Sequence, residues 1–161
     1  MNDALLQSAL RLHQSGRLAE ASRIYADILR GNPRHFQALY LLGFIKLQDG
    51  QFEDAQQLIG EAIKLNPRSP DAHYNRGCAL QGLDRAEEAL GCFDAAIALN
   101  PRYDEALVNR GATLLSLKRY PEALASFDVA LALKPADVEA LASRRSEEHT
   151  SELQSQSTIS Y

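Results

Sequence analysis

Residues 74–111, YNRGCALQGLDRAEEALGCFDAAIALNPRYDEALVNRG, decide the fold, because they contain two copies of the tripeptide Asn-Arg-Gly, at 75–77 and 109–111. The two copies are 34 residues apart, and prolines recur with the same step along the chain. These prolines are Pro33, Pro67, Pro101 and Pro135. A fixed step of this length is the signature of a protein built from stacked supersecondary repeats.

The step divides the chain into four complete units, 2–35, 36–69, 70–103 and 104–137, and a partial fifth, 138–144. Within each unit, apolar residues recur at steps of three and four, which indicates two amphipathic helices. Acidic residues such as Glu20 and Glu122 mark the start of each second helix, where they suit the positive end of the helix dipole. The recurring proline ends that helix. We therefore expect an all-α fold of antiparallel helix hairpins.

Small residues recur where the helices of such a stack must approach closely. We number the residues of each unit from 1 to 34. Glycine is at position 8 of three units, as Gly43, Gly77 and Gly111, and the first unit has Ala9 there. Large side chains at position 24, including Tyr25 and Phe127, are expected to fill the space that these residues leave.

With this register, residues 2–144 resemble the tetratricopeptide repeat family. The resemblance implies a right-handed α-solenoid, the superhelix of this family, whose first helices line a concave groove for a protein or peptide client. The positions that face this groove in the family carry aromatic and amide side chains here. They are Tyr40, Phe44, Tyr74, Asn75, Gln81 and Asn109.

Aromatic rings bury large areas, and asparagine and glutamine can each donate to and accept from an extended peptide backbone. Two alternatives remain, because asparagine is common at its position in these repeats, and Tyr40 or Phe44 could simply pack against a neighbouring helix. No lysine or arginine occupies the central groove positions of the complete units. A clamp for an acidic C-terminus is therefore not expected.

A row of arginines, Arg76, Arg110 and Arg144, recurs at position 7. It could donate hydrogen bonds to a partner, but we favour side-chain stems packed along the helices with solvated head groups.

The composition excludes several other functions. A net charge of −4 does not suggest a nucleic-acid or membrane partner. We find no catalytic motif, no metal site and no cofactor signature, and His13, His35 and His73 stand at different repeat positions. Cys78 and Cys92 have neither redox nor zinc-site spacing, so we interpret them as core residues. With no signal peptide or long apolar run, we expect a cytoplasmic protein that is not an enzyme.

The tail, residues 145–161, interrupts the repeat at the position where glycine is expected. Its segment 145–155, RSEEHTSELQS, resembles the translation of a sequencing adapter, and Ile159, Ser160 and Tyr161 fit the constant adapter stretch that follows. We therefore expect a bacterial, metagenomic reading frame that leaves its gene after residue 144, followed by a disordered segment or frayed helix. The fourth repeat would then lack a cap and could self-associate.

Two functions fit these observations. The first is a protein–protein interaction scaffold that holds an extended peptide or client protein in its groove. The second is the N-terminal, substrate-recruiting arm of a larger enzyme, because YNRG at 74–77 and VNRG at 108–111 resemble the repeat arms of bacterial O-linked N-acetylglucosamine transferase-like proteins.

Overall fold

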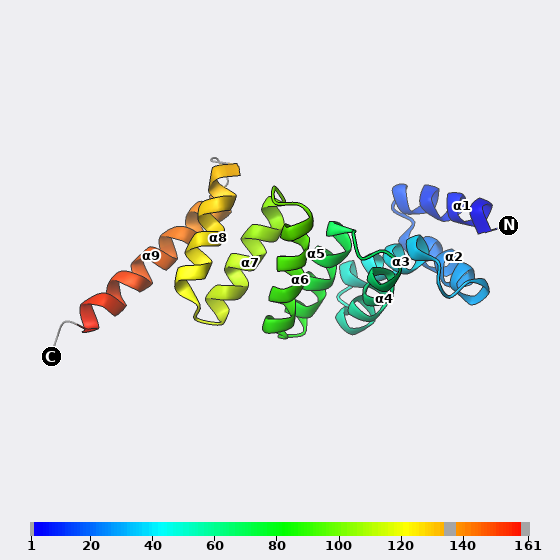
Figure 1. Cartoon of the computed structure of the whole chain (residues 1–161). Coiled ribbons are helices and arrows are strands. Elements are labelled where there is room, and N and C mark those ends of the chain that lie inside the picture. The colour runs from blue at the N-terminus through cyan, green and yellow to red at the C-terminus, as the bar shows by residue number, and fades with distance from the viewer. Residues whose placement is uncertain (1, 134–137, 159–161) are drawn as a thin grey trace. The chain divides into compact units, whose positions relative to one another are not determined.

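The computed structural model describes residues 2–133 and 138–158, and every regular element in those ranges is an α-helix. Figure 1 shows these helices as successive hairpins. The helices are α1 (Asn2–Gln14), α2 (Leu18–Gly31), α3 (Phe36–Gln48), α4 (Phe52–Leu65), α5 (Pro70–Gly82), α6 (Ala86–Leu99), α7 (Asp104–Ser116), α8 (Tyr120–Leu133) and α9 (Val138–Thr158). The odd-numbered helices begin on the residues where the repeat units begin, which confirms the expected hairpin array.

The chain divides into two compact bodies, which we call the N-terminal body (Met1–Asp84) and the C-terminal body (Arg85–Tyr161). In the N-terminal body, α1 packs on α2, α3 on α2 and α4, and α5 on α4 and α3. In the C-terminal body, α7 packs on α6 and α8, and α9 packs on α8 and α7.

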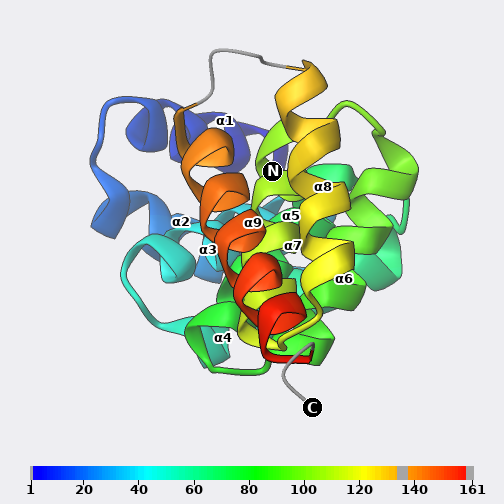
Figure 2. The ribbon, with the colours of Figure 1, turned by 90° about the vertical axis from the view of Figure 1, so that its left-hand side faces the viewer.

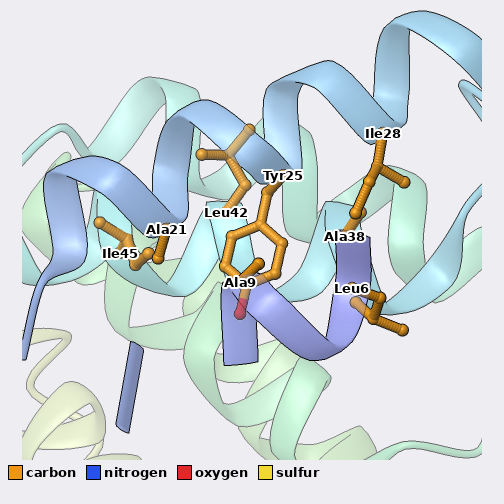
Figure 3. Packing of buried hydrophobic residues seen from close by; sticks show 8 residues of the cluster. All are labelled: Leu6, Ala9, Ala21, Tyr25, Ile28, Ala38, Leu42 and Ile45. Carbon is orange, nitrogen blue, oxygen red and sulfur yellow. The ribbon is translucent and has the colours of Figure 1, made fainter. Parts of the chain in front are cut away.

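The core of the N-terminal body forms around Tyr25, whose side chain extends from α2 beside Ala9 of α1 (Figure 3). Both residues are completely buried. Ala21 of α2 and Ala38 of α3 are also completely buried, so little side-chain volume separates these helices. The small residues therefore lie at the close contacts that the sequence predicts.

Glycine at position 8 is required by the packing in both bodies. A Cβ atom on Gly43 would lie 2.7 Å from Cγ1 of Ile59, and one on Gly111 would lie 2.5 Å from Cε1 of Phe127. Ile59 and Phe127 are completely buried at position 24 of their units. The two helices of a hairpin thus touch through the bare face of one and a large side chain of the other.

Each turn within a hairpin contains one residue in the left-handed region, always at position 15. Gly16 and Gly50 have φ values of 77° and 72°, whereas Asp84 and Lys118 adopt the same conformation at 57° and 59°. Glycine enters this region without a steric penalty, but other residues do so at a cost. The turn geometry is therefore kept even where glycine is absent.

Both ends of the second helices are held by polar contacts. Arginines at position 16 form paired hydrogen bonds with glutamates at position 19, as Arg17 does with Glu20 and Arg119 with Glu122. Beyond the helix, the side-chain oxygen of Asn32 accepts a 3.2 Å hydrogen bond from the backbone nitrogen of Arg34. Asn66 and Asn100 make the same contact with Arg68 and Arg102. The first-turn acids of α2, α6 and α8 therefore have arginine partners as well as the helix dipole, whereas Asp54 of α4 is paired with Lys46.

The tail differs from the expectation of a disordered or frayed segment, because α9 continues as a helix to Thr158. Figures 1 and 2 show α9 beside α8. Glu147 of α9 is buried, with 1% of its surface exposed, at a position whose equivalents Ile45, Ala79 and Thr113 are also buried. With these residues present, α9 packs on the fourth hairpin, while the adapter origin of residues 145–161 stays a prediction. Residues 159–161 of the tail lie outside the described residues.

Candidate functional site

A row of side chains crosses three successive first helices of the N-terminal body. On α3, Phe36, Tyr40 and Phe44 follow each other at four-residue steps, so they lie on one face of the helix. The Phe36 and Tyr40 ring centroids are 6.1 Å apart, and those of Tyr40 and Phe44 are 6.5 Å apart, with nearly parallel rings in both pairs. His13 of α1 stacks on Phe44 at 6.2 Å. We call His13, Phe44, Tyr40 and Asn75 the aromatic–amide row.

Asn75 of α5 joins the row through its side-chain amide, whose Nδ2 donates a 2.8 Å hydrogen bond to the hydroxyl oxygen of Tyr40. Asn75 is buried, with 7% of its surface exposed, whereas Tyr40 is half-buried. Burial raises the pKa of the Tyr40 hydroxyl and the nearby Asp71 carboxylate raises it further, while the bond from Asn75 lowers it. Tyr40 therefore keeps its proton at neutral pH.

The sequence analysis missed His13, although it stands at position 12 of its unit, which faces the groove in this family. The same position rule, applied to the first unit, would have found it. Its Nδ1 lies 3.5 Å from the hydroxyl oxygen of Tyr25, and its ring meets the Tyr25 ring edge-on. His13 is half-buried, so one side of the ring supports the row while part of it stays accessible.

The other predicted groove residues are distributed over both bodies. Tyr74 and Gln81 are half-buried on α5, in the N-terminal body, and Asn109 is half-buried on α7, in the C-terminal body. The backbone oxygen of Asn109 accepts a hydrogen bond from the hydroxyl of Thr113. The structure therefore joins Tyr40, Phe44 and Asn75 by contacts, and places Asn109 on a separate body.

Two of the arginines at position 7, Arg110 and Arg144, are partly exposed and also have carboxylate partners. Nε of Arg110 lies 2.5 Å from Oδ1 of Asp94, and Nε of Arg144 lies 2.6 Å from Oδ1 of Asp128. Arg110 also donates to the hydroxyl of Ser126. The sequence analysis did not identify these partners: each aspartate is on the preceding helix, where it meets the arginine across the helix–helix contact.

The histidines at the helix starts have structural partners. Nδ1 of His35 accepts a hydrogen bond from the backbone nitrogen of Ala38 and so caps α3, and Nε2 of His73 lies 2.9 Å from the backbone oxygen of Pro67. Within residues 2–133 and 138–158, no group of three or more His, Cys, Asp or Glu side chains could hold a metal ion. In that same part of the chain, no helix is long and apolar enough to cross a membrane.

Known proteins of one repeat family match the chain over most of the repeat array. Two models of the tetratricopeptide repeat family match residues 12–81 and 74–138. A search of curated protein sequences gave no match.

Several solved structures share the fold. A crystal structure of MamA protein is 22% identical, with a TM-score of 0.89 over 98% of this chain and 86% of that one. YrrB, described as a tetratricopeptide repeat protein with an unusual peptide-binding site, is 23% identical, with a TM-score of 0.82 over 90% of this chain and 75% of that one. The first repeat domain of Spaghetti (RPAP3), bound to the HSP90 peptide SRMEEVD, is 25% identical, with a TM-score of 0.69 over 71% of this chain and 91% of that one.

The two family matches together extend from residue 12 to residue 138, with helix hairpins in the same register, and the chain therefore belongs to the tetratricopeptide repeat family.

Proposed function

We propose that this chain is a protein-interaction scaffold that binds an extended peptide segment of a client along the aromatic–amide row. The observation that carries the proposal is the continuity of the row, from His13 on α1 through Phe44 and Tyr40 on α3 to Asn75 on α5. Peptide binding by the related RPAP3 and YrrB domains supports it.

The row offers groups that suit a peptide with little side-chain preference. The half-buried rings of Tyr40 and Phe44 can cover apolar side chains at small entropic cost. Because the Tyr40 hydroxyl accepts from Asn75, its own proton would be donated to a peptide carbonyl oxygen. Asn75 would contribute its amide oxygen, since its nitrogen is held by Tyr40. On α5 of the same body, Tyr74 and Gln81 would extend the binding surface, and Asn109 on α7 would offer its amide to a peptide from the C-terminal body.

A display library of random peptides, selected against the full chain, tests the proposal. Peptides that bind are measured by fluorescence anisotropy with the wild type and with Phe44→Ala. Loss of the Phe44 ring removes the stacking partner of both His13 and Tyr40, so we expect binding to weaken by about tenfold or more.

Val129→Ala is the matched control, because it truncates an apolar side chain that is 47% exposed on α8 and does not belong to the row. It should bind as the wild type does. Equal binding by Phe44→Ala, with an unchanged helical circular dichroism spectrum, would contradict the proposal.

A second proposal is that the array recruits substrates for a larger, O-linked N-acetylglucosamine transferase-like glycosyltransferase in the bacterial cytoplasm. The asparagines at position 6 of two consecutive units, Asn75 and Asn109, favour it. Sequencing the natural gene past codon 144 tests it together with the adapter origin of residues 145–161. A glycosyltransferase domain beyond further repeats would support the enzyme, whereas codons for residues 145–161 in genomic DNA would contradict the adapter origin.

A further inference from the structure

The arginine–aspartate pairs of the C-terminal body follow a rule of register. In each pair, an aspartate at position 25 of one unit meets the arginine at position 7 of the next, 16 residues later. Asp94 and Arg110 obey this rule, as do Asp128 and Arg144. The same two positions on α4 and α5 of the N-terminal body are Gly60 and Arg76. Arg76 thus stands in the repeated site without the carboxylate that the other arginines have.

The contacts of Arg76 agree with this comparison. Its Nε is buried from solvent and has no hydrogen-bond partner among the described residues. A Cβ atom on Gly60 would lie 3.4 Å from this Nε and 3.7 Å from the central guanidinium carbon, so the two residues face each other across the α4–α5 contact. A buried donor without an acceptor costs free energy, more so when the donor is charged.

A hollow of about 710 Å³ opens beside the missing side chain. It is lined by Arg76 and by residues of α4 that include Gly60, Leu58 and Ile63. The other charged residues of its lining have partners of their own. Nζ of Lys64 lies 2.5 Å from Oε1 of Glu61, and Asp54 is paired with Lys46 at 3.9 Å. Arg76 is therefore the cation of this lining that lacks an anionic partner within the described chain.

We propose that the hollow lined by Gly60 and Arg76 is a binding site for an acidic side chain of a partner polypeptide. The carboxylate of a glutamate or aspartate supplies the charge that Asp94 supplies beside Arg110, and forms an ion pair with the guanidinium group of Arg76. The apolar side chains of Leu58 and Ile63 receive the methylene groups next to this carboxylate. The lining contains none of the aromatic–amide row, so the site is a second contact surface, independent of the proposed groove.

The test follows the Nε–H signals of Arg76 and Arg110 by ¹H–¹⁵N NMR in the full chain. The probes are acetate, the blocked tripeptide N-acetyl-Ala-Glu-Ala-amide and its glutamine counterpart. We expect the glutamate peptide to shift the Arg76 signal in a saturable way and the glutamine peptide to leave it unchanged. Arg110 is the internal control, because its Nε–H group is already hydrogen-bonded to Asp94.

Two variants of Gly60 distinguish charge pairing from a change of shape. Gly60→Asp supplies the missing carboxylate within the chain, so the response of Arg76 to the glutamate peptide should weaken by about tenfold or more. Gly60→Ala adds a Cβ atom at ordinary contact distance but no charge, and should keep the response within about threefold. The converse variant Asp94→Gly should make the Arg110 signal respond to the glutamate peptide.

Three results would overturn the proposal: no saturable shift of the Arg76 signal, a shift with acetate but not with the glutamate peptide, or equal binding by Gly60→Asp. These results are separable from those of the groove, because Phe44→Ala leaves the lining of this hollow unchanged, and Gly60→Asp leaves the row unchanged.

Discussion

Asn75 and Tyr40 are 35 residues apart, yet the amide of the first donates to the hydroxyl of the second over 2.8 Å. The bond links α3 to α5, which are first helices of consecutive hairpins and also touch directly. It closes the polar end of the row and fixes the orientation of the Tyr40 ring. The sequence predicts that Asn75 binds a ligand through both the nitrogen and the oxygen of its side-chain amide. In the structure, the nitrogen is bonded to Tyr40, and this bond orders the site.

Removal of the Tyr40 hydroxyl should destabilise the fold. In Tyr40→Phe, the buried Nδ2 of Asn75 loses its acceptor, and we expect a loss of about 1 to 3 kcal/mol. Urea unfolding of Tyr40→Phe, Asn75→Ala and the double variant measures the coupling between them, expected to be about 1 kcal/mol. Strictly additive effects of the two substitutions would show that the bond does not contribute to stability.

Gly111 should not tolerate even one additional methyl group. In Gly111→Ala the new Cβ would lie 2.5 Å from the buried Phe127 ring, and the overpacking should cost about 1 to 3 kcal/mol. Gly91→Ala is the matched control, since no atom lies within 4 Å of a Cβ there and the better helix propensity of alanine should add about 1 kcal/mol. Thermal unfolding should therefore move in opposite directions for the two variants. A shift in the same direction would refute the close contact between α7 and α8.

Lys118→Gly should stabilise the turn between α7 and α8. The left-handed conformation of Lys118, with φ of 59°, costs an L-residue about 1 to 2 kcal/mol. Glycine avoids this cost, but it loses more backbone entropy on folding, which offsets about half of the gain. We expect the free energy of unfolding to rise by about 0.5 to 1 kcal/mol. Gly50→Ala, at φ of 72°, provides the reverse comparison and should lower it. A lower melting temperature of Lys118→Gly would contradict this account of the turn.

Glu147 should make the stability of the protein depend on pH. Burial raises the pKa of its carboxyl above the ordinary value, and the hydrogen bond from Ser151 only partly opposes this. Between the ordinary pKa and the raised one, the folded chain holds a proton that the unfolded chain releases, so stability falls as pH rises through this interval. Above the raised pKa, the carboxyl is ionised in both the folded and the unfolded chain, and the free energy of unfolding stays at its lower value.

Glu147→Gln, which cannot ionise, should flatten this part of the profile and unfold at higher urea concentration at neutral pH. Urea titrations from about pH 4 to pH 8 would measure it. Glu148→Gln is the control, because that neighbouring side chain is more accessible and pairs with Arg144. An unchanged slope in Glu147→Gln would mean that the carboxylate is solvated in the folded chain.

The hairpins were predictable because they follow from local patterns. The 34-residue step, the spacing of apolar residues and the small residue at position 8 together determine where each helix begins and which face it buries. Contacts between Gly111 and Phe127 follow from this register, since both residues belong to one hairpin. The prediction that Tyr40, Phe44 and Asn75 belong to one site follows from the family pattern, and the structure joins them by contacts.

The contacts across hairpins were harder to predict, because they depend on how one helix lies over another. The bond from Asn75 to Tyr40 is one such contact. The aspartate partners of Arg110 and Arg144 are another, although Asp94 and Asp128 recur with the same 34-residue step and could have been recognised. The tail was judged from its resemblance to an adapter, while the helix of α9 depends on backbone propensity and packing against α8, which do not depend on the origin of a sequence.

The pairing between position 25 and position 7 joins consecutive hairpins, so a change in the number of copies would create new pairs. Loss of one 34-codon copy by unequal crossing-over joins two hairpins that were not neighbours. If the fourth copy is lost, Asp94 meets Arg144 and the pair survives. If the third is lost, Gly60 meets Arg110, which then takes the unpaired place that Arg76 had. Loss of any one complete copy therefore leaves a single arginine of this row without a carboxylate, as in the present chain.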